Sequence, residues 1–140
     1  MKYIERSLIP LITQNLKPNK VVVLLGARRT GKSVLIKKII STFPGKSLFL
    51  DGDDFTTLNL FQPRTIENFR LLLGTIKLLV IDEAQQIPEI GKALKLIVDH
   101  IPGIQVLITG SSAFDITNKT GEPLTGRKRT LSIGKSPRRD

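Results

Sequence analysis

Short apolar runs alternate along this chain with segments in which apolar residues recur every three or four positions. The runs are Val21–Leu25, Ser47–Leu50, Leu78–Ile81, Gln105–Ile108 and Thr130–Ile133. Continuous apolar runs of this length are typical of strands buried on both faces of a parallel sheet. We therefore predict that each run is a strand.

The segments between these runs have helical spacing. Helices are predicted within residues 1–20, from residue 32 to about 43, over Thr65–Leu73 and from Pro88 to Ile101. Ser7 is expected to cap the first helix, with Pro10 in its first turn, and Pro88 is expected at the first position of the last helix. Alternating strands and helices predict an α/β fold of three layers, with right-handed crossovers and helices on both faces of the sheet.

The turn after the first predicted strand carries a glycine-rich motif. Gly26-Ala27-Arg28-Arg29-Thr30-Gly31-Lys32-Ser33 fits G-x-x-x-x-G-K-[ST], the phosphate-binding loop (P-loop) of nucleoside triphosphatases. Loop N–H groups and the following helix N-terminus face the phosphates, Lys32 reaches the β- and γ-phosphates, and the Ser33 hydroxyl binds Mg²⁺. The motif therefore predicts that residues 26–34, ending at Val34, bind ATP together with Mg²⁺.

A second acidic motif follows the run Leu78–Ile81. Asp82 and Glu83 end this predicted strand. In a parallel sheet they lie at the same edge as the P-loop, because ligands bind at the carboxyl ends of the strands. Asp82 is predicted to hold the Mg²⁺ shell opposite Ser33, and Glu83 to activate the water that attacks the γ-phosphate.

Three further segments hold weaker candidates. Ser111 is the first candidate for a sensor of the γ-phosphate and Thr109 the second, since both end another buried strand. Turn formation explains these residues equally well. Arg127 is a candidate arginine finger at the phosphate-binding edge, or part of a solvated basic patch with its neighbours. The aspartates in Asp51–Asp54 favour a polar loop over a metal site.

Composition limits the class of protein. A chain of 140 residues is one domain, and without cysteine it has neither disulfides nor thiolate chemistry. His100 is the single histidine, which excludes a histidine metal cluster. The sequence has neither a membrane-length apolar run nor a signal peptide, so we expect a cytoplasmic protein without membrane partners.

The net charge of +10 is unevenly distributed. From Thr117 onward the chain has seven basic and two acidic residues. Such a segment favours nucleic acid or another polyanion, and a solvated basic tail is an equal alternative. We expect residues 1–133 to form the folded domain and residues 134–140 to be a disordered basic tail, because glycine, proline and charges bury little apolar area.

These motifs together resemble the AAA+-like ATPases of archaea and bacteria. The resemblance is carried by residues 21–33, by Leu79–Gln85, by Leu107–Ser112 and by Leu124–Arg127, and it extends from the start of the chain to about Ile133. It implies the sheet order 5-1-4-3-2, Mg-ATP as ligand, the roles given above for Lys32, Ser33, Asp82 and Glu83, and a polar sensor near Ser111. A homo-oligomer or a protein partner is also expected.

The end of the chain departs from the family. Members continue into further helices and a C-terminal domain, which residues 134–140 do not resemble, so we expect that domain to be missing and turnover to be weak. Two alternatives stay open: a P-loop kinase of small molecules, and a basic nucleic-acid-binding module with a vestigial nucleotide site.

Overall fold

The structure of the chain is a computed structural model that describes residues 2–26, 32–110 and 124–132. The elements, in chain order, are α1 (Lys2–Asn15), β1 (Lys20–Leu25), α2 (Lys32–Thr42), β2 (Ser47–Asp51), α3 (Phe55–Phe61), α4 (Ile66–Leu73), β3 (Leu78–Asp82), the short 3-10 helix η1 (Ala84–Gln86), α5 (Ile90–His100), β4 (Gln105–Gly110) and β5 (Lys128–Ser132).

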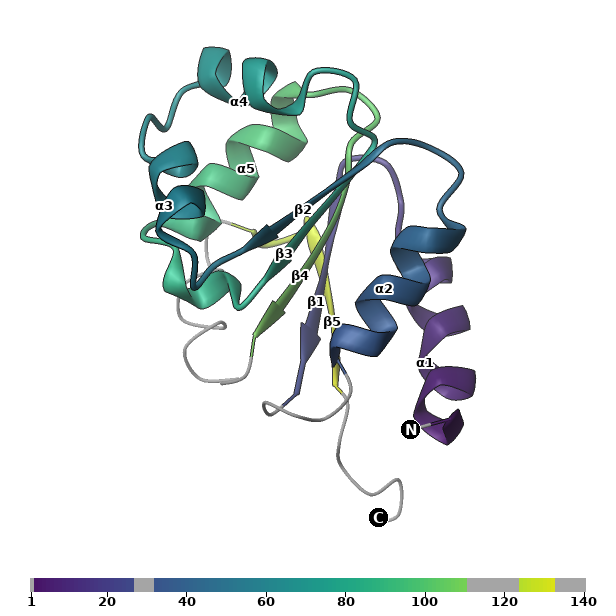
Figure 1. The fold of residues 1–140 in the computed structure, drawn as a ribbon. Coiled ribbons are helices and arrows are strands. Elements are labelled where there is room, and N and C mark those ends of the chain that lie inside the picture. Colours follow the sequence, from purple (N-terminus) through teal and green to yellow (C-terminus); the bar gives the residue numbers. More distant parts are fainter. Residues whose placement is uncertain (1, 27–31, 111–123, 133–140) are drawn as a thin grey trace.

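The five strands form one parallel sheet in the order β2-β3-β4-β1-β5. Read from the other edge, this is the predicted order 5-1-4-3-2. The central strands are buried on both faces, which explains why they read as unbroken apolar runs. The predicted α/β fold, with a parallel sheet between two layers of helices, is confirmed (Figure 1).

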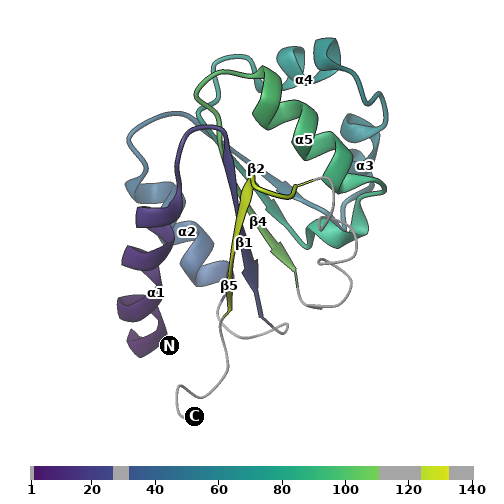
Figure 2. The ribbon, with the colours of Figure 1, turned by 180° about the vertical axis from the view of Figure 1, so that it is seen from behind.

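Helices cover the two faces of the sheet unequally. Helices α1 and α2 pack on one face, while α3, α4, η1 and α5 cover the other (Figures 1 and 2). Alternate residues of each strand face opposite ways. In β1, Val22 and Leu24 belong to the apolar cluster of the α1–α2 side, and Val21 and Val23 belong to the cluster of the α3–α5 side.

Two predictions about helix starts are wrong. Helix α1 begins at Lys2, so Ser7 does not cap it and Pro10 lies inside the helix. Burial of Leu8 and Ile12 on the sheet side offsets the hydrogen bond that is lost at Pro10. Pro88 also lies outside a helix, because α5 begins only at Ile90, after a residue with positive φ.

Helix α3 was not expected from the sequence. Its N-cap is Asp54, whose side chain accepts a hydrogen bond from the Thr56 backbone N–H (3.0 Å). Asp51 likewise accepts from the Asp53 N–H (2.9 Å). The aspartates of this segment therefore organise a polar loop and a helix start, as the sequence favoured.

The ends of the chain are only partly described. Residues 133–140, which contain the predicted tail, lie outside the described residues, so the domain boundary at 133 stays a prediction. Within the described ranges, every helix is too short or too polar to cross a bilayer.

Candidate functional site

The carboxyl ends of β1, β3 and β4 lie side by side, and α2 starts beside them. Lys32 is the first residue of α2, and its Nζ donates to Oε2 of Glu83 at 3.0 Å. Lys32 is 6% exposed and Glu83 is 4% exposed. Removing one partner of a buried ion pair typically lowers the stability of the fold by about 3–5 kcal/mol, because the other charge stays buried without compensation. The two residues that the sequence assigned to phosphate binding and to catalysis are thus in direct contact.

Each carboxylate oxygen of Glu83 accepts a hydrogen bond. Gln85 Nε2 donates to Glu83 Oε1 at 2.8 Å, while Lys32 occupies Oε2. The backbone of Glu83 is left-handed (φ 51°, ψ 50°), which costs a residue with a side chain about 1–3 kcal/mol. Such strain is found where surrounding contacts fix an unusual side-chain direction, as the contacts of Glu83 do here.

Thr109 joins the two acidic residues. Its hydroxyl donates to Oδ1 of Asp82 and accepts from the backbone N–H of Glu83 at 3.1 Å. Thr109 is fully buried at the end of β4, next to β3. One hydroxyl therefore orients the Asp82 carboxylate and satisfies the buried N–H of the strained residue. Thr109 was the second choice as sensor, and it contacts the acidic pair directly.

Gly52 secures the same strand end from the other side. Its N–H donates to the Asp82 carbonyl at 2.7 Å. A Cβ at this position would lie 2.1 Å from the Glu83 carbonyl oxygen, closer than atoms can approach. Sequence reasoning missed this role and read Gly52 only as part of a polar loop.

Ser33 and Asp82 border one small pocket. Together with Ile36, Lys37, Ile40 and Phe49 they line a space of about 150 Å³. A hydroxyl and a carboxylate are ligands that suit Mg²⁺, which keeps several waters and takes only one or two protein oxygens. These residues fit the predicted metal. Among the described residues, no group of three or more His, Cys, Asp or Glu is arranged to hold an ion.

The P-loop itself is described only at its two ends. Gly26 follows β1, and its N–H donates to the Gly110 carbonyl at 3.1 Å. Ala27, Arg28, Arg29, Thr30 and Gly31 lie outside the described residues, as does Ser111. Val34, the last residue of the predicted segment, is exposed on α2.

The structure corrects the predicted position of Arg127. It precedes β5, whose Lys128 pairs with Val21 at the start of β1, so Arg127 lies at the amino edge of the parallel sheet. There its Nε and Nη2 donate to Asp99 at 2.7 and 3.2 Å. The hydrogen bond from Arg127 lowers the pKa of Asp99, and the carboxylate raises that of Arg127. A residue before a parallel strand cannot share an edge with residues that follow such strands.

Asn19 is a second residue of the amino edge whose role the sequence did not reveal. Its Nδ2 donates to the carbonyls of Val98 and Ile101 at 2.7 and 2.9 Å, and its Oδ1 accepts from the Gly103 N–H at 3.1 Å. Asn19 also has positive φ (62°), a conformation that Asn tolerates better than most residues. It ties the start of β1 to the end of α5.

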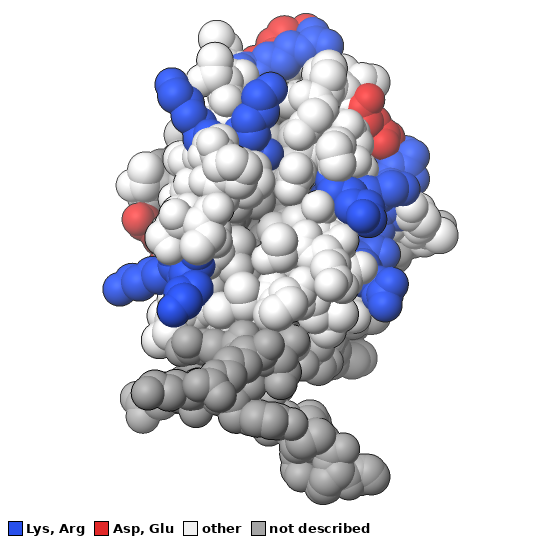
Figure 3. All heavy atoms as spheres, turned by 90° about the vertical axis from the view of Figure 1, so that its right-hand side faces the viewer, with Lys and Arg blue, Asp and Glu red and all other residues white. Residues whose placement is uncertain are grey.

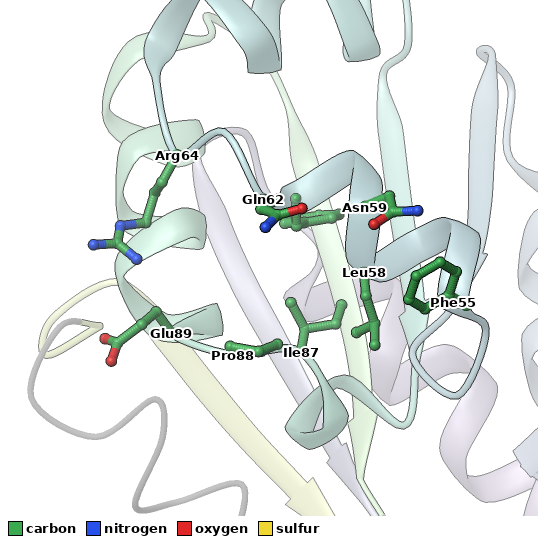
Figure 4. Close-up of a pocket in the computed structure, with 9 residues that line it drawn as sticks. Phe55, Leu58, Asn59, Gln62, Arg64, Ile87, Pro88 and Glu89 are labelled. Atoms are coloured by element: carbon green, nitrogen blue, oxygen red, sulfur yellow. The ribbon is translucent and has the colours of Figure 1, made fainter.

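A larger pocket lies away from the Lys32–Glu83 pair. It holds about 320 Å³ between α3 and the segment from η1 to α5 (Figure 4). Phe55, Leu58, Ile87 and Pro88 contribute apolar side chains, Gln62 lies above them, and Arg64 and Glu89 lie at the left of the view (Figure 4). No residue of the predicted nucleotide site lines it.

Known proteins resemble this chain in sequence and in fold. The family model described as AAA domain matches residues 18–135. Uncharacterized proteins of Mycobacterium bovis and Mycobacterium tuberculosis are each 29% identical over 114 residues, 81% of this chain and 24% of theirs. An uncharacterized protein of Methanocaldococcus jannaschii is 29% identical over 119 residues, 83% of this chain and 26% of its own. The chain thus spans about a quarter of the length of these curated relatives.

Solved structures share the fold at low sequence identity, and one of them is an initiator of replication. The replication initiator DnaA, bound to AMPPCP and single-stranded DNA, matches with a TM-score of 0.58 and 17% identity. The match covers 93% of this chain and 45% of the DnaA chain. It supports the P-loop fold that the sheet order already indicates.

Proposed function

Because the chain belongs to the AAA domain family, an ATPase-type family, we propose that it binds Mg-ATP at the carboxyl edge of its sheet and hydrolyses it. The observation that carries the proposal is the buried pair of Lys32 and Glu83. A lysine at the start of a helix and a carboxylate at the end of a nearby strand are two of the charged groups that P-loop ATPases use, together with Mg²⁺, to transfer phosphate to water.

In this structure Lys32 and Glu83 neutralise each other. The Lys32 ammonium that would contact the phosphates is bound to Glu83 Oε2. Phosphate oxygens offer this ammonium another anionic partner at the N-terminus of α2. Once Lys32 exchanges partners, the Glu83 carboxylate accepts a proton from water, while Gln85 still donates to Oε1.

Ser33 and Asp82 are the proposed Mg²⁺ ligands. When bound, Mg²⁺ would neutralise charge on the phosphate oxygens. Thr109 keeps Asp82 oriented through its hydroxyl, which is therefore a positioning group in this proposal. Ser111 remains the proposed sensor. A protein partner or a homo-oligomer is also part of the proposal.

A nucleotide titration tests the proposal. Calorimetry with ATP, with and without Mg²⁺, should show Mg²⁺-enhanced binding that Lys32→Ala weakens by roughly tenfold or more, since a charged hydrogen bond is lost. Lys32→Ala also leaves Glu83 buried without its cation, so Lys32→Ala with Glu83→Gln serves as the control for folding. ATP binding of equal strength in the parent and in both variants would contradict the proposed site.

A phosphate-release assay distinguishes an ATPase from a kinase of small molecules. Transfer of the γ-phosphate to water, lost on Lys32→Ala, supports an ATPase. Transfer to a small hydroxyl acceptor would identify a kinase instead.

A further inference from the structure

The two helical layers differ in charge. From Arg6 to Leu50 the sequence contains nine basic residues and no Asp or Glu, and this stretch forms most of α1, β1, α2 and the start of β2. From Asp51 to Gln105, which supplies the other layer, acidic residues outnumber Lys and Arg by eight to five. Among the described residues from Arg6 to Leu50, which contain most of the α1–α2 layer, the exposed basic side chains are those of Lys17, Lys20, Lys37, Lys38 and Lys46, and they are distinct from the C-terminal tail.

Basic side chains lie exposed over this layer. Lys37 and Lys38 are exposed on α2, Lys46 follows α2 in the turn before β2, and Lys17 lies just after α1. Figure 3, which faces the α1–α2 side, shows several separate groups of Lys and Arg side chains around a mostly uncharged centre, with fewer acidic side chains among them. The ion pairs among described residues involve Lys32, Lys92 and Arg127, and none of them neutralises Lys37, Lys38 or Lys46.

An exposed aromatic side chain accompanies these lysines. Phe49 is 46% exposed on β2, the edge strand, and it lies opposite Val80, which belongs to the apolar cluster of the α1–α2 side. Phe49 lines the 150 Å³ pocket together with Ile36, Lys37 and Ile40 of α2, and this is the same pocket that Ser33 and Asp82 border. Exposing an aromatic ring costs hydrophobic free energy, so a half-exposed Phe in a pocket beside lysines is a candidate contact surface.

We propose that this basic surface, formed by Lys37, Lys38, Lys46 and Phe49, binds single-stranded nucleic acid. Lysines along α2 and the following turn neutralise successive phosphates, and a base stacks on the exposed part of the Phe49 ring, outside the space that Ser33 and Asp82 border. A positively charged surface that is interrupted by aromatic side chains is the arrangement that binds single strands without strong sequence preference. In duplexes the bases are stacked on each other, so the ring of Phe49 favours the single strand.

Binding to a labelled oligo-dT of fifteen nucleotides, without ATP, tests this surface independently of the proposed ATPase. Lys38→Glu with Lys46→Glu should weaken binding by roughly tenfold or more at low salt, because two phosphate contacts become repulsive. Lys92→Glu with Lys95→Glu, on α5 of the other layer, makes the same change in net charge and should have a much smaller effect. Thermal unfolding checks that both double variants are folded.

Phe49→Leu isolates the stacking contact. Leu keeps the apolar character of the pocket but removes the aromatic face, so affinity for oligo-dT should fall by about fivefold or more while affinity for a DNA duplex stays the same. Unchanged binding by Lys38→Glu with Lys46→Glu, or an equal loss in the α5 control, would overturn the surface. Equal losses for oligo-dT and duplex with Phe49→Leu would overturn the stacking role. Binding to phosphatidylserine vesicles but not to oligo-dT would show that the partner is a membrane surface.

Discussion

The two edges of the sheet use polar side chains in opposite ways. At the carboxyl edge, Lys32, Glu83 and Thr109 are buried and share partners within one network. At the amino edge, roughly 17–20 Å away along strands of five or six residues, Arg127 and Asp99 pair at the surface. Asn19 there bonds only to backbone groups.

The difference concerns which contacts can be exchanged. Asn19 bonds to backbone groups at the end of α5, on the edge of the sheet opposite the proposed nucleotide site, so its contacts are expected to serve stability alone. Lys32 and Glu83 each have a second possible partner, a phosphate and a water, so their contact can break when those partners arrive. Substitutions at the two edges should therefore affect activity and stability separately.

Glu83→Gln should give the largest effect. The amide keeps the shape of the side chain but cannot take a proton from water, so phosphate release should fall by about a hundredfold or more. Mg-ATP binding by the folded protein should persist, because Lys32 no longer has to leave a carboxylate. Urea unfolding measures the stability that is lost when buried Lys32 has no anionic partner. Glu67→Gln is the matched control, because Glu67 is exposed on α4, away from the site, and this variant should release phosphate at the rate of the parent. Equal turnover in both variants would exclude Glu83 as the base.

Gly52→Ala should affect both activity and stability. A Cβ 2.1 Å from the Glu83 carbonyl forces the strand end to move, and overpacking of this kind costs about 1–3 kcal/mol. Because Glu83 moves with it, phosphate release should fall by more than the loss of folded protein explains. Gly103→Ala is an informative comparison, since its φ of 80° strains alanine although a Cβ there meets nothing within 4 Å. Normal turnover in Gly52→Ala would show that this close approach does not position Glu83.

Asn19→Ala should lower stability and leave catalysis intact. It removes three hydrogen bonds at the end of α5 and places alanine at a positive φ, which together should cost about 2–3 kcal/mol in urea unfolding. Asn19→Gly relieves the backbone strain but still loses the bonds, so it should recover part of the difference. A change in ATP affinity in either variant would contradict the separation of the two edges.

Arg127→Gln should have the smallest effect. The hydrogen bond from Arg127 lowers the pKa of Asp99 in the folded state below its ordinary value of 3.8. The ion pair therefore stabilises the fold at pH values above 3.8, and this stabilisation is lost as the pH falls through the folded-state pKa. The variant should therefore unfold slightly more easily at neutral pH, and the parent and variant should converge at acidic pH. Salt should reduce the difference, because the pair is exposed.

The same variant tests the arginine finger. Arg127 lies at the amino edge of the sheet, so it is too far from the proposed nucleotide site of its own chain to act there as an arginine finger. If phosphate release by Arg127→Gln falls only at high protein concentration, a second copy supplies the guanidinium to the site of its neighbour.

The sequence by itself determined the strands, their order through the family resemblance, and the pairing of P-loop and acidic motif at one edge. Apolar runs and the fixed spacing of Gly26, Gly31, Lys32 and Ser33 are local signals, and parallel topology then brings the carboxyl ends of strands together. The start of α1 was mispredicted because burial of Leu8 and Ile12 outweighed a local signal at Pro10.

Only the tertiary structure decided the remaining contacts. Gly52 lies against the Glu83 carbonyl, and Asn19 donates a hydrogen bond to the Val98 carbonyl. The partners in each contact are far apart in the sequence, so local sequence patterns do not predict them. Arg127 was misplaced because its distance from the motifs along the chain does not say at which end of the sheet it lies. The direction of β5 sets that position, since a residue before a parallel strand and a residue after one are separated by the full length of the strand.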